Sequence, residues 1–170
     1  MDSSDRINLT FVSSISKELD ELKRVSTRLN DIDVSHIVRA MALSRSPVIV
    51  TGVGKSGLIG RKFAATLSSY GRTAVFVHPT DAFHGDLGLI APKSVVVMLS
   101  NSGQSQDLIA LAKLLSQRTC YIICITGNES SSLASLCNAA IVYGKVDEIC
   151  PFGEAPTTST MAMLLICDAL

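Results

Sequence analysis

Residues 47–57 read Pro-Val-Ile-Val-Thr-Gly-Val-Gly-Lys-Ser-Gly, a short apolar run that ends in a glycine-rich loop. Good helix formers follow from residue 57 to residue 70. A short apolar run bounded by glycine is typical of a buried strand, and a strand that leads through a loop into a helix begins a βαβ unit. This stretch therefore predicts an α/β fold built on a parallel sheet, whose strands are apolar on both faces.

The same alternation continues toward the end of the chain. We expect further strands at residues 73–77, 94–99, 121–125 and 139–142, and further helices over 108–115 and 157–170. Five strands separated by helices predict right-handed crossovers and a parallel sheet with helices on both faces. The final helix stops without a glycine, proline or polar cap, so we expect the chain to be a piece of a longer polypeptide.

Residues 1–46 follow a different pattern. Apolar residues recur at spacings of three and four between residues 5 and 30, which predicts an amphipathic helix. Asp33 is placed to cap a second helix that carries Ile37 and Met41. We expect the two helices to form a hairpin packed on the same domain as residues 47–170. The apolar stripe of the first helix carries no evident chemistry and is expected to face the core or another subunit.

Charge and composition exclude several classes of partner. Basic and acidic side chains number seven of each in residues 1–46 and eight of each in residues 47–170. Nucleic acids and anionic membranes select for a basic patch, so neither is expected as a partner. No uncharged apolar run reaches the roughly 18 residues of a membrane span, and the acidic N-terminus is unlike a secretory signal. Five cysteines without a C-x-x-C pair predict reduced thiols and a cytoplasmic protein.

The first glycine loop resembles two known motifs without satisfying either. A Walker A motif needs a glycine where Ile49 stands, so the P-loop interpretation fails. Gly52, Gly54 and Gly57 match the dinucleotide fingerprint, but no acidic residue ends the next strand to hold a ribose. What remains is a helix N-terminus suited to an anion. Ligands of parallel sheets bind beyond the carboxyl ends of the strands, which here means the loops at 52–57, 78–88, 100–106 and 126–130.

Residues 100–105, Ser-Asn-Ser-Gly-Gln-Ser, again lie between an apolar strand and a helix. Three hydroxyls, the amide of Asn101 and the backbone N–H groups converge on one helix N-terminus. Neutral donors in this arrangement are suited to a phosphate monoester. The alternative is an ordinary helix cap, although capping requires only one of these side chains.

Two further segments carry candidate chemistry. His78 and His84 are spaced unlike the ligands of a structural zinc site, so no metal is expected. His84 could carry a proton or bind a sugar hydroxyl, and its alternative role is to cap its own loop. Glu148 precedes an apolar residue and could point into a pocket as a base with a raised pKa. Its alternative is a solvated carboxylate, and Thr157 is expected to cap the last helix.

Together these segments resemble the SIS (sugar isomerase) domain of D-arabinose 5-phosphate isomerases of the KpsF/GutQ/KdsD type. The resemblance covers roughly residues 5–170, with the motifs in order. The motifs that carry it are Gly52-Val-Gly-Lys-Ser-Gly57, Val77-His-Pro79, His84-Gly-Asp-Leu-Gly88, Ser100-Asn-Ser-Gly103, Ile125-Thr-Gly-Asn128 and Cys150-Pro with Ala155-Pro-Thr-Thr-Ser-Thr160.

The resemblance implies a flavodoxin-like, doubly wound three-layer αβα sandwich with a five-stranded parallel sheet and no organic cofactor. It further implies interconversion of D-ribulose 5-phosphate and D-arabinose 5-phosphate, which feeds Kdo synthesis for lipopolysaccharide or capsule. Members of this family are homotetramers with active sites at subunit contacts. The resemblance also places a further functional histidine, and usually a CBS pair, beyond the last helix of this chain.

Aldose–ketose isomerisation needs a base that moves a proton between C1 and C2 through an enediol, donors for the developing oxyanion, and a grip on the phosphate. We expect Glu148 to act as the base and Lys55 to polarise the reacting oxygen. His84 and Asp107 would assist proton transfer and ring opening, although Asp107 is one methylene shorter than the family's glutamate. The residues expected to bind the substrate and its phosphate are Gly54, Ser56, His78, Ser100, Asn101, Ser102, Ser105 and Thr157.

Two other functions compete with this interpretation. SIS domains also occur in regulators, so the chain could sense a sugar phosphate without catalysing a reaction. The set Lys55, His84 and Glu148 favours the enzyme, because a sensor needs the serine loops but no base. A dinucleotide-binding oxidoreductase is disfavoured by the missing acidic residue near His78.

Overall fold

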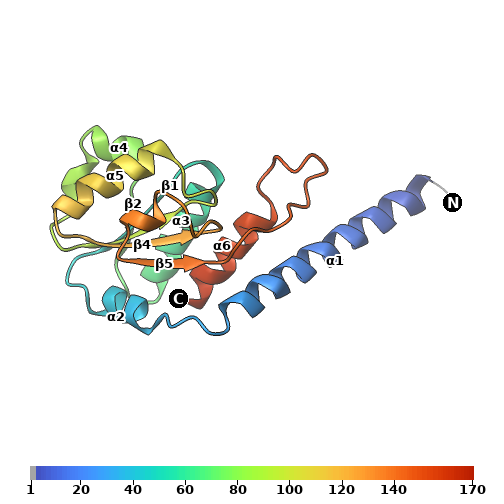
Figure 1. The fold of residues 1–170 in the computed structure, drawn as a ribbon, viewed down its shortest axis with the longest axis horizontal. Helices are drawn as coiled ribbons and strands as arrows, with labels where there is room; N and C mark the ends of the chain where they lie inside the picture. Colours follow the sequence, from blue (N-terminus) through green and yellow to red (C-terminus); the bar gives the residue numbers. More distant parts are fainter. Residues whose placement is uncertain (1–2) are drawn as a thin grey trace.

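Five parallel strands form one sheet in the order β2-β1-β3-β4-β5 (Figure 1). The computed structural model describes residues 3–170. The strands are β1 (Val48–Gly52), β2 (Ala74–Phe76), β3 (Val95–Leu99), β4 (Tyr121–Thr126) and β5 (Ala139–Val142). The predicted five-stranded parallel sheet is therefore confirmed, and the strand order is that of a flavodoxin-like, doubly wound fold.

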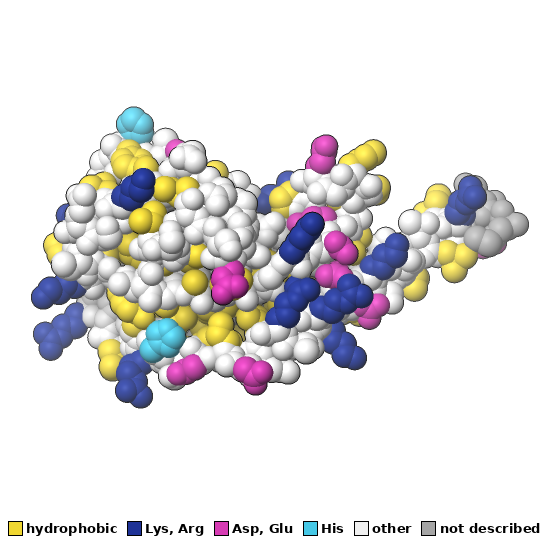
Figure 2. Space-filling view, viewed as in Figure 1, with side chains coloured by type: hydrophobic (Ala, Val, Ile, Leu, Met, Phe, Trp, Pro, Cys, Tyr) yellow, Lys and Arg dark blue, Asp and Glu magenta, His cyan; other side chains and the backbone are white. Residues whose placement is uncertain are grey.

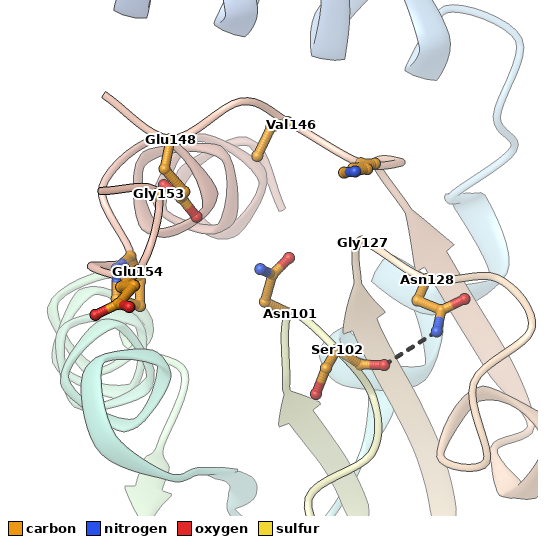
Figure 3. Close-up of a pocket in the computed structure, with 10 residues that line it drawn as sticks. Asn101, Ser102, Gly127, Asn128, Val146, Glu148, Gly153 and Glu154 are labelled. Atoms are coloured by element: carbon orange, nitrogen blue, oxygen red, sulfur yellow. Dashed lines mark hydrogen bonds between the residues drawn. The ribbon is translucent and has the colours of Figure 1, made fainter. Parts of the chain in front are cut away.

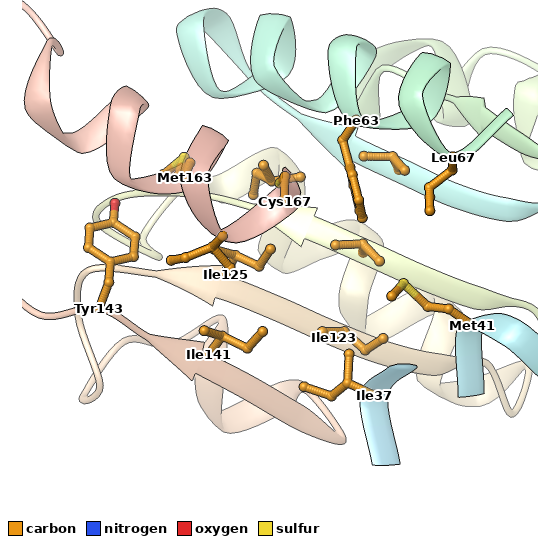
Figure 4. Packing of buried hydrophobic residues seen from close by; sticks show 14 of the residues in the cluster. Ile37, Met41, Phe63, Leu67, Ile123, Ile125, Ile141, Tyr143, Met163 and Cys167 are labelled. Carbon is orange, nitrogen blue, oxygen red and sulfur yellow. The ribbon is translucent and has the colours of Figure 1, made fainter. Parts of the chain in front are cut away.

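Helices cover both faces of the sheet, which makes three layers. The helices are α1 (Ser3–Leu29), α2 (Ser35–Leu43), α3 (Gly54–Ser69), α4 (Pro79–Phe83), α5 (Gln106–Gln117) and α6 (Thr158–Ala169). On one face, α2, α3 and α6 bury Met41, Phe63 and Met163 against the sheet (Figure 4). On the other face, α4 and α5 bury Ala82 and Leu108.

The central strands explain why the sequence shows continuous apolar runs. Val95 and Val97 of β3 belong to the core on one face, whereas Val96 and Met98 belong to the core on the other. Side chains alternate between the faces of a strand, so a strand covered on both sides has no solvent-facing position. All five residues of β1 and of β3 are accordingly buried.

The chain reverses its direction of winding between β1 and β3, which are hydrogen-bonded neighbours. From β1 the chain crosses through α3 to the edge strand β2, and from β3 it crosses through α5 to β4 on the other side. The loops after β1 and β3 therefore leave in opposite directions and open a crevice at the carboxyl ends of the strands.

The two N-terminal helices are present but do not pack side by side along their lengths as the expected hairpin would. They extend in different directions from the connection at residues 30–34 (Figure 1). α2 closes the core beneath the sheet, whereas α1 projects from the domain, and only its C-terminal part joins the core, through Val25. The difference has a physical reason, because the apolar residues of the first half of α1 meet no partner in this chain.

The segment 78–88, expected to be a loop, contains the short helix α4 and a 3-10 turn at Asp86–Leu89. Pro79 stands at the first position of α4, where its fixed φ suits a helix and its missing N–H costs nothing. His78 caps the same helix, since its Nδ1 accepts a hydrogen bond from the Thr80 N–H at 3.3 Å. Within residues 3–170, no helix is long and apolar enough to span a membrane.

Candidate functional site

A pocket of about 510 Å³ opens at the carboxyl ends of β3, β4 and β5 (Figure 3). The loop after β3 forms one side of it, and the segment between β5 and α6 forms the other. The lining residues are Asn101, Ser102, Gly127, Asn128, Lys145, Val146, Glu148, Gly153, Glu154 and Pro156. Of the expected site residues, the structure brings Asn101, Ser102 and Glu148 together here.

The serines of the loop after β3 fold the loop back on itself. The Ser100 hydroxyl accepts a hydrogen bond from the Gly103 N–H at 3.1 Å, and the Ser102 hydroxyl accepts one from the Gln104 N–H at 3.2 Å. Ser105 stands at the N-cap of α5, but its side chain makes no capping hydrogen bond. The first N–H groups of α5 therefore have no side-chain cap, which is the condition for receiving an external anion.

Gly103 allows this loop to approach the loop after β4. Its φ is +61°, a left-handed conformation that favours glycine. A Cβ atom at this position would lie 2.2 Å from the Ser131 hydroxyl, closer than any contact between non-bonded atoms. The glycine of the Ser-Asn-Ser-Gly motif is thus required for the packing of two neighbouring loops.

Hydrogen bonds lock the loop after β3 to the loop after β4. The Asn101 carbonyl accepts bonds from the Gly127 N–H at 3.0 Å and from the Thr126 hydroxyl at 3.1 Å. The Asn128 side-chain amide donates to the Ser102 carbonyl at 3.3 Å (Figure 3). These contacts hold the floor of the pocket rigid before any ligand binds.

Glu148 is anchored at the N-terminus of α6. One oxygen, Oε2, accepts bonds from the Thr157 N–H at 2.7 Å, the Thr157 hydroxyl at 3.0 Å and the Ser159 N–H at 3.2 Å. Thr157 is itself fixed, because its hydroxyl accepts a bond from the Ile149 N–H at 2.9 Å. Thr157 occupies the N-cap position of α6, as expected, but its side chain makes no capping hydrogen bond. Its hydroxyl donates to Glu148 instead.

The expected raised pKa of Glu148 is wrong in direction. Partial burial raises the pKa of this carboxyl, but the hydrogen bonds from Ser159 and Thr157 outweigh burial and hold it below the ordinary value. Hydrogen bonds to the charged form favour that form, so the side chain is ionised at neutral pH. It is also more than a solvated carboxylate, since it accepts hydrogen bonds from two backbone N–H groups at the N-terminus of α6.

The glycine loop after β1 lies next to this site without lining the same pocket. Gly52 pairs with Leu99 in the sheet, so the loops after β1 and β3 start side by side. Gly54 has a φ of +58° and begins α3. Ser56 is half-buried in the first turn of α3, and the Lys55 side chain is exposed beside it.

The remaining expected residues lie farther from the pocket. His84 is exposed at the C-terminal end of α4, and Asp107 is exposed in the first turn of α5. His78 is half-buried and caps α4. In the described residues 3–170, none of these three side chains lines the pocket that holds Glu148.

Sequence reasoning did not single out several lining residues. Lys145, Val146 and Glu154 belong to the irregular segment between β5 and α6, where no periodic pattern marks them. The rule that ligands bind at the carboxyl ends of strands predicts that the loop 126–130 belongs to the site. It does not identify Gly127 and Asn128 as the residues of this loop that line the pocket. The pocket thus combines neutral donors on one side with an ionised carboxylate on the other.

The SIS domain family matches residues 43–170. The chain belongs to the SIS domain family. This SIS domain begins at the end of α2 and includes the whole sheet and both loops that form the pocket. The resemblance of the motifs to this family is therefore confirmed.

Named relatives agree with the resemblance. Arabinose 5-phosphate isomerase KdsD of Shigella flexneri is 47% identical over 126 residues, which make up 74% of this chain and 38% of that protein. Arabinose 5-phosphate isomerase KpsF of Escherichia coli is 36% identical over 173 residues, which cover 99% of this chain and 55% of that protein. The chain thus spans about half, or less, of the length of these curated relatives.

A solved structure matches the chain over nearly its entire length. The structure of Escherichia coli CFT073 c3406 in complex with arabinose 5-phosphate has a TM-score of 0.88 and 34% sequence identity. The match covers 99% of this chain and 89% of that chain. The agreement in fold includes the N-terminal helices that precede the SIS match.

Proposed function

We propose that this SIS domain interconverts D-ribulose 5-phosphate and D-arabinose 5-phosphate. The observation that carries the proposal is the pocket in which the loop 100–105 faces an ionised Glu148. A phosphate-binding loop opposite a carboxylate is the pair of features that an aldose–ketose isomerase of a sugar phosphate requires. The names of the relatives and the ligand of the similar solved structure support the same substrate.

The phosphate end of the substrate is assigned to the loops after β1 and β3. Ser56, Ser100, Ser102 and Ser105, with the backbone N–H groups at the start of α3 and α5, supply neutral donors for it. A ligand phosphate would replace the local hydrogen bond in which the Ser102 hydroxyl accepts from the Gln104 N–H. His78 and Gly54 are assigned to the edge of the same binding surface.

The proton transfer is assigned to Glu148. In the described part of the chain, the hydrogen bonds that Glu148 accepts fall on Oε2, which leaves Oε1 for the substrate. Oε1 takes a proton from C1 of ribulose 5-phosphate while O2 gains one, which forms the enediol. The same group then returns its proton to C2 while O1 loses its proton, which gives arabinose 5-phosphate. Lys55 stabilises the developing oxyanion, and His84 and Asp107 assist proton movement at the oxygens and ring opening.

The proposed assembly is a cytoplasmic homotetramer. Lys55, His84 and Asp107 are exposed in the single chain, and the first half of α1 presents unpartnered apolar side chains, so contacts between subunits would cover both. The reaction would supply arabinose 5-phosphate for the synthesis of Kdo, as expected from the resemblance. Neither nucleic acid nor a membrane is part of the proposal.

The deciding experiment is an assay of ribulose 5-phosphate conversion, made on the 170-residue chain and on the same chain extended past Leu170. Appearance of arabinose 5-phosphate with either chain supports the proposal. Binding of arabinose 5-phosphate by calorimetry without turnover in either chain would instead establish the sensor function. No binding and no turnover would exclude both.

A further inference from the structure

Tyr143 is a buried tyrosine that the assigned reaction does not use. It follows β5 directly, and its N–H donates to the Thr126 carbonyl at 3.0 Å, so the strand pairing continues to this residue. Its side chain is completely buried. Figure 4 shows the ring beside Ile125 and Met163, with the hydroxyl pointing away from the apolar cluster.

The Tyr143 hydroxyl makes one specific contact, with the pocket residue Asn101. It donates a hydrogen bond to Asn101 Oδ1 at 2.7 Å. Burial raises the pKa of the Tyr143 phenol and the nearby Glu148 carboxylate raises it further, so the hydroxyl keeps its proton and remains a donor. A buried tyrosine hydroxyl needs such a partner, and here the partner is a residue that lines the pocket.

In the structure the Asn101 amide turns its oxygen toward Tyr143. With Oδ1 bound to Tyr143, the remaining polar atom is Nδ2, a donor. In the view of Figure 3, Nδ2 lies on the side of Glu148, whereas the Ser102 backbone lies below it. The Asn101 amide therefore faces from the phosphate loop toward the carboxylate that handles the proton.

A second observation shows how closely the amide is confined. A Cβ atom at Gly127 would lie 2.6 Å from Asn101 Oδ1 and 3.2 Å from the Tyr143 ring. Only glycine at position 127 leaves room for the Asn101 amide against Tyr143. Tyr143 and Gly127, which follow β5 and β4, thus confine the side-chain amide of Asn101.

We propose that Tyr143 is a positioning residue that holds the Asn101 amide so that Nδ2 donates to a sugar oxygen of the bound sugar phosphate. The inference rests on the proposed function for the identity of the ligand. It assigns to Asn101 a contact with the sugar in place of the expected contact with the phosphate. A carbonyl or hydroxyl oxygen is the chemical group that such a donor would recognise.

The test begins with Tyr143→Phe, which removes one hydroxyl and leaves the buried ring in place. The dissociation constant for arabinose 5-phosphate, measured by calorimetry, should rise about 3- to 10-fold, the range of one hydrogen bond. The dissociation constant for inorganic phosphate should change less than about 2-fold. Tyr121→Phe is the matched control, since Tyr121 begins β4 at the amino ends of the strands and does not line the pocket.

A double-mutant cycle separates positioning from a general structural effect. In an Asn101→Ala background, Tyr143→Phe should have no further effect on arabinose 5-phosphate binding, because the group it positions is gone. Additive losses would overturn the proposal, as would equal losses for arabinose 5-phosphate and inorganic phosphate. Gly127→Ala should reproduce the selective loss by displacing the Asn101 amide while Tyr143 is intact.

The hydrogen bond can be tested without any ligand. In ¹⁵N-asparagine-labelled protein, the two side-chain N–H signals of Asn101 should move toward unstructured values and gain mobility in Tyr143→Phe, but not in Tyr121→Phe. Unchanged Asn101 signals would overturn the proposal. If the unsubstituted chain binds no arabinose 5-phosphate, the proposed function fails and the sugar contact fails with it, while the Asn101 signals still report the hydrogen bond separately.

Discussion

At the residue scale, the hydrogen bonds to Glu148 set both its charge and its position. Thr157 and Ser159 donate to one carboxylate oxygen, so the side chain enters the pocket ionised and with a fixed orientation. A base that is ionised at neutral pH needs no deprotonation before it acts. The same bonds satisfy N–H groups at the start of α6, which have no partner within the helix.

We expect Glu148→Gln to separate catalysis from binding. Glutamine keeps the size and the acceptor oxygen of glutamate but cannot take the C1 proton. Turnover should fall at least about 100-fold, the low end of general-base contributions, while the dissociation constant for ribulose 5-phosphate stays nearly unchanged. Exchange of the substrate proton with deuterated solvent, followed by NMR, should slow in parallel.

The comparison is made with the unsubstituted chain under the same conditions. Glu129→Gln is the matched control, since it removes an exposed carboxylate outside the pocket. Near-normal turnover by Glu148→Gln would move the base elsewhere, first to His84, whose imidazole can accept and return a proton.

Thr157→Val should destabilise the protein more at neutral than at acidic pH. The hydrogen bonds hold the folded-state pKa of Glu148 below its ordinary value. They therefore stabilise the fold fully above the unfolded-state pKa of about 4.3. This contribution is lost as the pH falls through the folded-state pKa. Loss of the threonine hydroxyl should lower the free energy of unfolding by about 1 kcal/mol at pH 7, because two backbone donors remain and the group is partly solvated.

Urea unfolding of Thr157→Val at pH 7 and at pH 3.5 measures this difference. Thr157→Ser keeps the hydroxyl and should behave like the unsubstituted chain at both pH values. Equal destabilisation by valine at the two pH values would show that the hydroxyl supports only the Ile149 N–H and not the charge of Glu148.

At the element scale, the loops beyond the strands carry the site because the central strands β1 and β3 have no solvent-facing position. Each buried strand delivers its loop to the same edge, and backbone hydrogen bonds between the loops after β3 and β4 fix their spacing. The helices that follow begin with free N–H groups, so anion binding is a property of the element and not of one residue.

Ser102→Ala should weaken sugar-phosphate binding without changing the fold. A hydrogen bond to a charged group is worth about 1.5–3 kcal/mol, which corresponds to a rise of roughly 10- to 100-fold in the dissociation constant for ribulose 5-phosphate. Calorimetry gives this value directly. Ser116→Ala, at the opposite end of α5, is the control and should bind normally. Unchanged affinity in Ser102→Ala would remove this loop from the phosphate site.

At the scale of the whole molecule, α1 is the feature that the single chain does not explain. Its first half projects from the domain, and hydrophobic side chains lie along it (Figure 2). The large apolar side chains that remain exposed on it are Ile7, Leu9, Phe11, Val12, Ile15 and Leu19. Apolar surface of this extent marks an interaction site, and closed homo-oligomers are the commonest solution.

We expect light scattering to give a mass several times 18.1 kDa at micromolar concentration. Phe11→Asp combined with Ile15→Asp should shift the protein toward the monomer, because a charge cannot be buried in an apolar interface without a partner. Ser13→Asp, which adds a charge at a polar position of the same helix, is the control. A mass near that of one chain for the unsubstituted protein would contradict the proposed tetramer.

The pattern of apolar residues along the chain is enough to predict the architecture. The apolar run that ends at Thr51 and the runs over 94–99 and 121–125 can be buried on both faces only in a parallel sheet between helices, so local pattern and fold agree. It also indicated the loops 100–106 and 126–130, because the position of parallel strand ends follows from the order of elements alone.

Properties that depend on neighbours distant in sequence could not be predicted in this way. The direction of the Glu148 pKa shift follows from Thr157 and Ser159, which no spacing rule connects to it. The orientation of Asn101 depends on Tyr143, which stands 42 residues away. Hydrophobic periodicity reports how much of a segment is buried, whereas charge state and donor direction are set by individual contacts at about 3 Å, and these exist only once the chain has folded.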